Sequence, residues 1–122
     1  MSLKKTTSPA KQKILITGAA GRIGSTLRSA WASEGRYDLT LLDLNKIDSE
    51  IIQADIRQAD QMKIVCQNQD VLVHLANIRY QDILEDPAQM TDITASMLLF
   101  EIARQAGISK IILPVGLFHL NN

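Results

Sequence analysis

Three glycines spaced three residues apart, Gly18, Gly21 and Gly24, directly follow a short run of aliphatic residues at 14–16. The run has no polar alternation, as expected of a strand buried on both faces of a parallel sheet. After the glycines, apolar residues recur at helical spacing, and Gly35 is the expected C-cap of that helix. Glycine permits a sharp turn, close approach of a phosphate to the backbone, and tight helix packing. The pattern therefore predicts a strand, a phosphate-binding loop over residues 18–24, and a helix.

An acidic residue, Asp43, ends the next apolar run, 19 residues after Gly24. A carboxylate at the end of the second strand accepts hydrogen bonds from adenosine ribose hydroxyls and repels a 2′-phosphate. The alternative is an aspartate that only caps a turn. The loop and this acid together predict a dinucleotide-binding unit over residues 13–43, with NAD favoured and NADP less so. Arg22, inside the loop, counts slightly against that preference because a guanidinium there suits a 2′-phosphate.

The rest of the chain alternates short apolar runs with helical stretches. We predict further strands around residues 50–54, at 71–75 and at 111–113, and helices over 59–68 and 87–106, the second capped by Gly107. Residues 77–86 are expected to be a loop with a short helical turn. Strands separated by helices and joined by short loops predict a parallel sheet covered on both faces. The expected fold class is α/β, a Rossmann-type doubly wound parallel sheet, truncated after about five strands.

Length and charge limit the alternatives. The 122 residues make one domain, expected as an NAD(P)-binding Rossmann domain over residues 12–122 behind a flexible polar tail at 1–11. Lys plus Arg and Asp plus Glu both count 13, a net charge of zero, so nothing favours nucleic acid or an anionic membrane as a partner. No apolar stretch approaches the ~20 residues that a membrane span needs. We expect a cytoplasmic protein.

Two residues that often carry chemistry are expected to be structural here. Cys66, the single cysteine, excludes an internal disulfide and fits a reducing compartment. It lies in an apolar run, which predicts a buried thiol rather than a nucleophile. His74 lies in a predicted strand and is expected to be a hydrogen-bonded core residue rather than a ligand or base. No set of His, Cys, Asp or Glu has metal-ligand spacing, so we expect no metal.

The segment from Thr17 to Gly24 has the form Thr-Gly-x-x-Gly-x-x-Gly. With it, residues 54–56, 70–76 and 92–107 resemble the N-terminal part of the extended short-chain dehydrogenase/reductase family, in its NAD-dependent epimerase/dehydratase branch. The resemblance covers roughly residues 13–113, and the layout is most similar to hexuronate dehydrogenases and sugar-nucleotide epimerases. It implies a sugar-like substrate, an adenine contact by Asp55, and an adenosine pocket lined by Leu75 and Ala76.

The loop motif and the resemblance together give one set of expected cofactor-binding residues. These are Gly18, Ala20, Gly21, Arg22, Ile23, Gly24, Asp43, Leu44, Asp55, Ile56, Leu75, Ala76 and Asn77.

The chain departs from the family at the positions that carry catalysis. The family places a Ser/Thr-rich stretch after strand five and a Tyr-x-x-x-Lys pair beyond it, in which the lysine lowers the pKa of the tyrosine. Residues 113–117 contain no hydroxyl, and Tyr37 and Tyr80 are each followed four positions later by leucine. Asp92 stands where the family usually has asparagine. We therefore expect no catalytic residue, and interpret the sequence as a truncated dehydrogenase that binds cofactor without its own catalysis. A cloned fragment, a frameshifted gene and a natural remnant all remain open, and the alternative function is a non-catalytic Rossmann interaction or redox-sensing protein.

The predicted helix at 93–106 is apolar around most of its circumference. Only Thr94, Glu101 and Gln105 form a polar stripe, whereas a helix that covers one sheet face needs a single apolar stripe. We expect the additional apolar face, through Leu98 and Ile102, to contact another helix. The resemblance implies that this contact is a two-fold homodimer. Packing under a further part of the same chain is the open alternative.

Overall fold

The computed structural model describes residues 10–76 and 90–114, with the backbone alone for 90–93. Its elements are β1 (Gln12–Thr17), α1 (Arg22–Ala32), β2 (Tyr37–Asp43), β3 (Ile51–Gln53), α2 (Ala59–Val65), β4 (Val71–His74), α4 (Met90–Gln105) and β5 (Lys110–Ile112). All paired strands are parallel, in the order β3-β2-β1-β4-β5. The predicted α/β fold with a five-stranded parallel sheet is confirmed.

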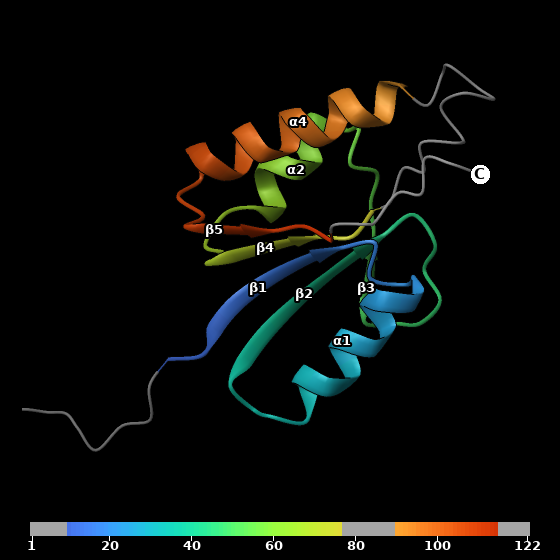
Figure 1. The fold of residues 1–122 in the computed structure, drawn as a ribbon, viewed down its shortest axis with the longest axis vertical. Helices are drawn as coiled ribbons and strands as arrows, with labels where there is room; N and C mark the ends of the chain where they lie inside the picture. The colour runs from blue at the N-terminus through green and yellow to red at the C-terminus, as the bar shows by residue number, and fades with distance from the viewer. Residues whose placement is uncertain (1–9, 77–89, 115–122) are drawn as a thin grey trace, which may run out of the picture.

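Helices cover both faces of the sheet: α1 lies on one side, and α2 and α4 lie on the other (Figure 1). Successive residues of β1 point to opposite faces. Ile14 and Ile16 belong to the core cluster that Leu27 and Trp31 of α1 pack against. Leu15, between them, belongs to the core formed with α2 and α4. Each face of the strand meets a helix, which explains why the run has no polar alternation.

The carboxyl end of β1 lies between two neighbouring strands. Thr17 is in register with Leu42 of β2 on one side and with His74 of β4 on the other. The chain therefore changes direction across the sheet at this point, since β2 and β3 extend one way and β4 and β5 the other. Ligands of doubly wound folds bind outside the carboxyl ends of strands at such a switch point. The sheet topology thus brings the segments after β1, β2 and β4 to one edge.

Two helix ends differ from the sequence prediction. The prediction that the helix beginning at 59 reaches residue 68 was wrong: α2 ends at Val65, and Asn68 has a φ of 64°. That left-handed conformation is incompatible with helix, and asparagine adopts it at low cost. The C-cap of α1 is Ser33 rather than Gly35, although Gly35 does have a positive φ of 71°.

The end of α4 follows the prediction that Gly107 is its cap. Gly107 has a φ of 92°, and its N–H donates to the carbonyl of Arg104, 3.1 Å away. The N–H of Ile108 donates to the carbonyl of Ala103 at 3.0 Å. This pair of bonds is the Schellman arrangement. It directs Ile108 back into the core, where 8% of its surface remains exposed. Pro87 and the loop at 77–86 lie outside the described residues.

The expectation for the outer face of α4 was half wrong. Leu98 is 47% exposed, but Ile102 is only 5% exposed and packs in the core with Leu99 and Ala103. These three residues follow helical spacing and pack in a core shared with α2, so Ile102 has no surface left for a further helix. The exposed apolar side chains on this side of the sheet, here called the α4–β5 surface, are instead Met97, Leu98 and Ile111, whereas Ile112 is in register with Val73 and points to the α1 side.

Cys66 is fully buried, and burial raises the pKa of its thiol to about 11. The prediction of a buried structural cysteine is confirmed. Among the helices in the described ranges, none is long and apolar enough to cross a membrane. Within the same ranges, no group of three or more His, Cys, Asp or Glu side chains could hold a metal ion.

Candidate functional site

The first glycine of the loop places backbone directly against backbone. Gly18 has a φ of 69°, the left-handed region that glycine enters freely. A Cβ on Gly18 would lie 2.6 Å from the amide nitrogen of Ala76 and 2.6 Å from the carbonyl carbon of Leu75. The prediction of a sharp turn at Gly18 is confirmed, and the structure adds a close approach to the chain leaving β4.

The other two glycines differ in what surrounds them. A Cβ on Gly24 would lie 2.6 Å from the carbonyl oxygen of Gly18 and 2.8 Å from the Cα of Ala19. The predicted tight packing of the helix is therefore found, with the loop backbone as its partner. A Cβ on Gly21 would meet only the carbonyl oxygen of Gly18, at 3.3 Å. Gly21 is the N-cap of α1 and borders open space, so a ligand rather than the protein can use the missing side chain.

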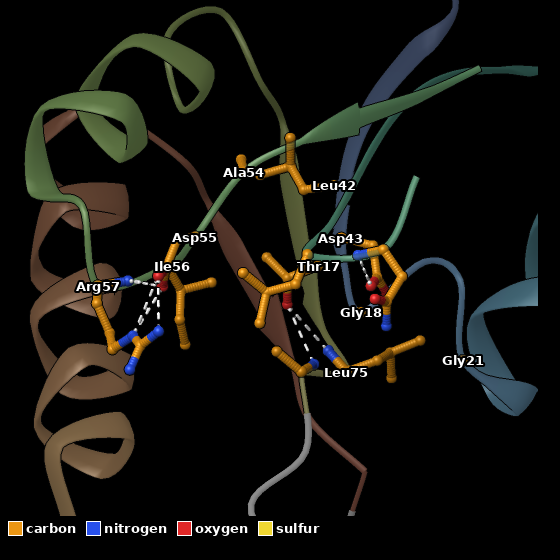
Figure 2. A pocket seen from close by; sticks show the side chains of 13 residues that line it. Thr17, Gly18, Gly21, Leu42, Asp43, Ala54, Asp55, Ile56, Arg57 and Leu75 are labelled. Carbon is orange, nitrogen blue, oxygen red and sulfur yellow. Dashed lines mark hydrogen bonds and ion pairs between the residues drawn. The ribbon is translucent and has the colours of Figure 1, made fainter. Parts of the chain in front are cut away.

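That open space is a cavity of about 490 Å³ at the carboxyl edge of the sheet (Figure 2). Eight of the expected site residues line it: Gly18, Gly21, Asp43, Leu44, Asp55, Ile56, Leu75 and Ala76. Four others, Ala20, Arg22, Ile23 and Gly24, lie in the loop and the first turn of α1 without lining the cavity. Asn77 lies outside the described residues. The lining residues that we did not expect are Thr17, Leu42, Asn45, Ala54 and Arg57.

Asp43 is held at the cavity wall by two backbone N–H groups. Its Oδ2 accepts a hydrogen bond from the N–H of Ala20 at 2.9 Å, and its Oδ1 accepts one from the N–H of Asn45 at 2.8 Å. The second bond is the turn-capping interaction that was the alternative reading of this residue. A carboxylate offers about four acceptor positions, so these two bonds leave capacity for hydroxyl groups of a ligand.

Asp55 forms an ion pair with Arg57 at the other side of the cavity (Figure 2). Arg57 Nη2 lies 2.8 Å from Asp55 Oδ2, and the backbone N–H of Arg57 donates to Asp55 Oδ1 at 2.9 Å. The hydrogen bond from the guanidinium holds the pKa of Asp55 below its usual value. Asp55 therefore combines a turn role with a charged position at the cavity. The Asp-x-Arg spacing was the sequence signal by which Arg57 could have been found.

A buried hydrogen-bonded chain lies behind the cavity wall. The hydroxyl of Thr17, which has no exposed surface, accepts from the N–H groups of Leu75 at 3.1 Å and Ala76 at 3.3 Å. It lies 2.5 Å from Nδ1 of His74, whose Nε2 lies 2.9 Å from the Ser96 hydroxyl of α4. His74 is 5% exposed, and burial lowers its pKa to about 4. The prediction of a hydrogen-bonded core histidine is confirmed.

The arrangement suits a nucleotide by its chemistry. The first turn of α1 contains no acidic side chain, and its N–H groups and positive dipole end favour an anion such as a phosphate. The carboxylate of Asp43 offers acceptors for a diol. The side chains of Ile56 and Leu75 give the same cavity apolar surface for a flat ring.

Known proteins resemble this chain over most of its length. The family model described as "NAD dependent epimerase/dehydratase family" matches residues 14–114. UDP-glucose 4-epimerase from Mycolicibacterium smegmatis is 31% identical over 116 residues, covering 82% of this chain and 37% of the relative. L-arabinose 1-dehydrogenase (NAD(P)(+)) from Haloferax volcanii is 29% identical over 103 residues, covering 82% of this chain and 39% of the relative. This chain thus spans about two fifths of the length of these curated relatives.

Solved structures share the fold. A mutant of uronate dehydrogenase from Agrobacterium tumefaciens, complexed with NAD, superposes with a TM-score of 0.67 at 29% identity, covering 85% of this chain and 40% of the other. A short-chain dehydrogenase/reductase superfamily protein from the same organism, with bound NAD, gives a TM-score of 0.72 at 19% identity. It covers 84% of this chain and 32% of the other and demonstrates the shared fold alone.

Proposed function

The chain belongs to the NAD-dependent epimerase/dehydratase family, and we propose that residues 12–122 are a unit that binds the adenine half of NAD in the cavity beside the glycine loop. The resemblance to the extended short-chain dehydrogenase/reductases, inferred from the Thr17 to Gly24 motif, is confirmed by this membership. Residues 1–11 are proposed as a tail outside that unit. Cys66, a single buried thiol, supports a reducing compartment such as the cytoplasm.

The observation that carries the proposal is the pairing of Gly21 with Asp43 across one cavity. A Cβ at Gly18 or Gly24 would collide with backbone atoms at 2.6 Å, whereas one at Gly21 would meet a single backbone atom, the carbonyl oxygen of Gly18, at 3.3 Å. The open space at Gly21 adjoins the N-terminus of α1, where a pyrophosphate is stabilised by the N–H groups and the helix dipole. Asp43 lines the same cavity with acceptor capacity to spare. A ribose joined to a pyrophosphate needs these two features, a carboxylate and a helix N-terminus, beside one cavity.

The proposed site favours NAD over NADP. The carboxylate of Asp43 would repel a 2′-phosphate on the adenosine ribose, while it accepts hydrogen bonds from the two free hydroxyls of NAD. Arg22 was the residue whose positive charge counted against NAD in the sequence. It does not line the cavity. Asp55 is proposed to accept from the adenine amino group with the oxygen capacity that the Arg57 pair leaves.

The proposed role of these residues does not include the chemical step of the family's reaction. In a dehydrogenase or epimerase acting on a sugar-like substrate, bound NAD accepts or returns a hydride. This chain holds and orients the dinucleotide, and neither tyrosine in its sequence is followed by a lysine four positions later. We therefore propose binding without catalysis of its own by the 122 residues.

Calorimetric titration of the 122-residue chain with NAD and with NADP tests the proposal. NAD should bind measurably and more tightly than NADP, and Gly21→Trp should abolish binding because its side chain would occupy the phosphate position. Asp43→Ala should weaken NAD by about tenfold, worth ~1.4 kcal/mol, and reduce the preference over NADP. Ala32→Trp, an exposed change at the other end of α1, is the control for bulk. Folded wild-type protein that binds neither dinucleotide would contradict the proposal.

The α4–β5 surface favours a second candidate, a non-catalytic interaction protein that forms a homodimer. Met97 is 67% exposed and Leu98 47% exposed on α4, and Ile111 is 37% exposed on the same side of the neighbouring edge strand. Exposed apolar residues that gather on one surface mark protein contacts. Size-exclusion chromatography should then give a discrete dimer that Leu98→Glu dissociates. A monomer at every concentration would exclude this candidate and leave the NAD proposal intact.

A further inference from the structure

One wall of the cavity consists of backbone whose position depends on a neighbour. Leu75 and Ala76 leave β4 directly against Gly18, where a Cβ would lie 2.6 Å from the amide nitrogen of Ala76. Both residues line the cavity together with Gly18. Contact this close means that a shift of the Leu75–Ala76 peptide displaces the first residue of the glycine loop. The shape of the site therefore depends on the group that holds this peptide in place.

The Thr17 hydroxyl is the group that fixes it. Its oxygen accepts from the N–H of Ala76 at 3.3 Å, the amide of this peptide, and from the N–H of Leu75, which also donates to the backbone carbonyl of Thr17 at 3.0 Å. A hydroxyl has two acceptor lone pairs and one proton, so these two bonds use its whole acceptor capacity. Its proton is then donated to the remaining neighbour, Nδ1 of His74, at 2.5 Å.

This donation determines the tautomer of His74. Nδ1 must be unprotonated to accept from Thr17, so a neutral ring carries its proton on Nε2. Nε2 lies 2.9 Å from Oγ of Ser96 on α4, which accepts that proton. The edge-on contact with Phe100, whose ring centroid lies 5.4 Å away at an interplanar angle of 88°, limits rotation of the imidazole.

We propose that His74 and Ser96 are positioning residues of the dinucleotide site, acting through the Thr17 hydroxyl on the backbone of Leu75 and Ala76. The proposal rests on the proposed NAD-binding function. Neither side chain lines the cavity, so both act without touching a ligand there. If His74 carried its proton on Nδ1, it would donate to Thr17 and occupy one lone pair. The N–H of Ala76 would then lose its acceptor, whereas the N–H of Leu75 would keep the backbone carbonyl of Thr17, 3.0 Å away.

The burial of the histidine supports this assignment. Its pKa of about 4 keeps the ring neutral at physiological pH, as the hydrogen-bonded chain requires. The chain connects β1, β4 and α4, so it makes the geometry of the nucleotide site depend on a helix that covers one face of the sheet.

Four variants of the 122-residue chain test the proposal by NAD titration and thermal unfolding. Thr17→Val removes the hydroxyl at nearly constant shape and should weaken NAD binding about tenfold, whereas Thr17→Ser should stay within about twofold of wild type. Ser96→Ala leaves Nε2–H without its acceptor and should weaken binding about threefold. Thr40→Val is the matched control: Thr40 also accepts a side-chain hydrogen bond, from Gln69, but lies away from the cavity on β2. It should lower Tm and leave the Kd unchanged.

The tautomer is read independently by ¹⁵N NMR of the histidine ring in the wild-type chain. His74 should show a protonated Nε2 and an unprotonated Nδ1; a proton on Nδ1 would overturn the proposal. A purely structural role would lower Tm in Thr17→Val and Ser96→Ala while the Kd for NAD stays at the wild-type value, which also overturns it. If the wild-type protein binds no NAD, the proposed function is overturned, and the positioning role with it. The wild-type titration alone therefore distinguishes failure of the proposed function from failure of the positioning role.

Discussion

At the carboxyl end of β1, backbone lies against backbone with no room for a methyl group; on the α4–β5 surface, large apolar side chains face outward. A Cβ added at Gly18 or Gly24 would lie within 3 Å of the backbone of Leu75, Ala76 or Ala19. Met97 of α4 and Ile111 of β5 instead border a shallow groove beside the sheet edge. The first region is complete except for a small ligand. The second retains apolar surface that a macromolecular contact would cover.

The difference separates two kinds of sequence constraint. In the loop, a single added carbon atom is excluded by atoms that cannot move, so residue identity is fixed by local sterics. On the α4–β5 surface, residue identity affects association more than folding, because exposed positions contribute little to the free energy of unfolding. Four predictions test this contrast, from the largest expected effect to the smallest.

Gly18→Ala should destabilise the chain by about 4 kcal/mol, since left-handed strain of roughly 1–2 kcal/mol adds to overpacking of roughly 1–3 kcal/mol. Gly35→Ala is the matched control, because Gly35 has nearly the same φ, 71°, with nothing within 4 Å of an added Cβ. It should lose only the strain. Urea denaturation measures both, and equal losses would mean that the contact with Ala76 does not constrain the loop.

Ile102→Ala should cost about 3 kcal/mol, within the usual range for removing a buried aliphatic side chain. Leu98→Ala, one helical turn away and half exposed, should change stability by less than about 0.5 kcal/mol. The pair compares an uncovered and a covered position on one side of α4 in one denaturation experiment. Similar losses at both positions would place Leu98 in a buried contact.

Acid should destabilise the folded chain by up to about 3 kcal/mol through His74, because its pKa falls from 6.5 to about 4 on folding and each pKa unit is worth about 1.4 kcal/mol. The unfolded state binds the proton first as pH falls, so this stability is fully present above pH 6.5 and is lost down to about pH 4. The pKa values of Asp48, Asp55 and Glu101 are also lowered in the folded chain. Protonation of these carboxylates reduces stability only at pH values near and below their usual pKa values of 3.8 to 4.5.

Urea midpoints measured between pH 5 and 7 therefore exclude the titration of these carboxylates. His74→Asn should remove most of the slope in that interval, although it lowers stability overall. A wild-type midpoint that stays flat from pH 7 to pH 5 would contradict the buried neutral ring.

Ile112→Lys should have the smallest effect on folding, within about 0.5 kcal/mol, since Ile112 is 44% exposed on the edge strand β5. A lysine on an edge strand opposes pairing with another chain, so the concentration at which the protein begins to scatter light should rise. Unfolding of this variant would show that Ile112 packs in the core.

The sequence predicted the loop better than the surface for a physical reason. Glycine spacing, the strand before it and Asp43 after it are local signals, and each corresponds to a steric or polar requirement found in the structure. Arg57 was missed because the Asp-x-Arg spacing permits an ion pair with Asp55 but does not require one. Whether the pair forms depends on the conformation of the two side chains. The positioning of the Leu75–Ala76 backbone by Thr17 was also missed, because residues 57 and more positions apart meet only when β1 and β4 pair.

Helix α4 shows where periodicity reaches its limit. A helix that is apolar around most of its circumference does not reveal which apolar face meets the sheet, because hydrophobic pattern alone distinguishes only apolar from polar faces. Ile102 and Leu98 were equivalent in that pattern. The two residues are four positions apart and lie on the same side of α4, so their different exposure, 5% and 47%, depends on what covers each position along the helix.

The contact between Gly24 and the backbone of Gly18 and Ala19 also has a consequence for evolution. Because a side chain at position 24 would collide with the backbone at 18, and one at 18 with the end of β4, a substitution at either position requires the backbone itself to move. A descendant that abandons the nucleotide is therefore expected to keep the first and third glycines as inherited architecture. Gly21, where an added Cβ would meet only the carbonyl oxygen of Gly18, at 3.3 Å, is less constrained by packing.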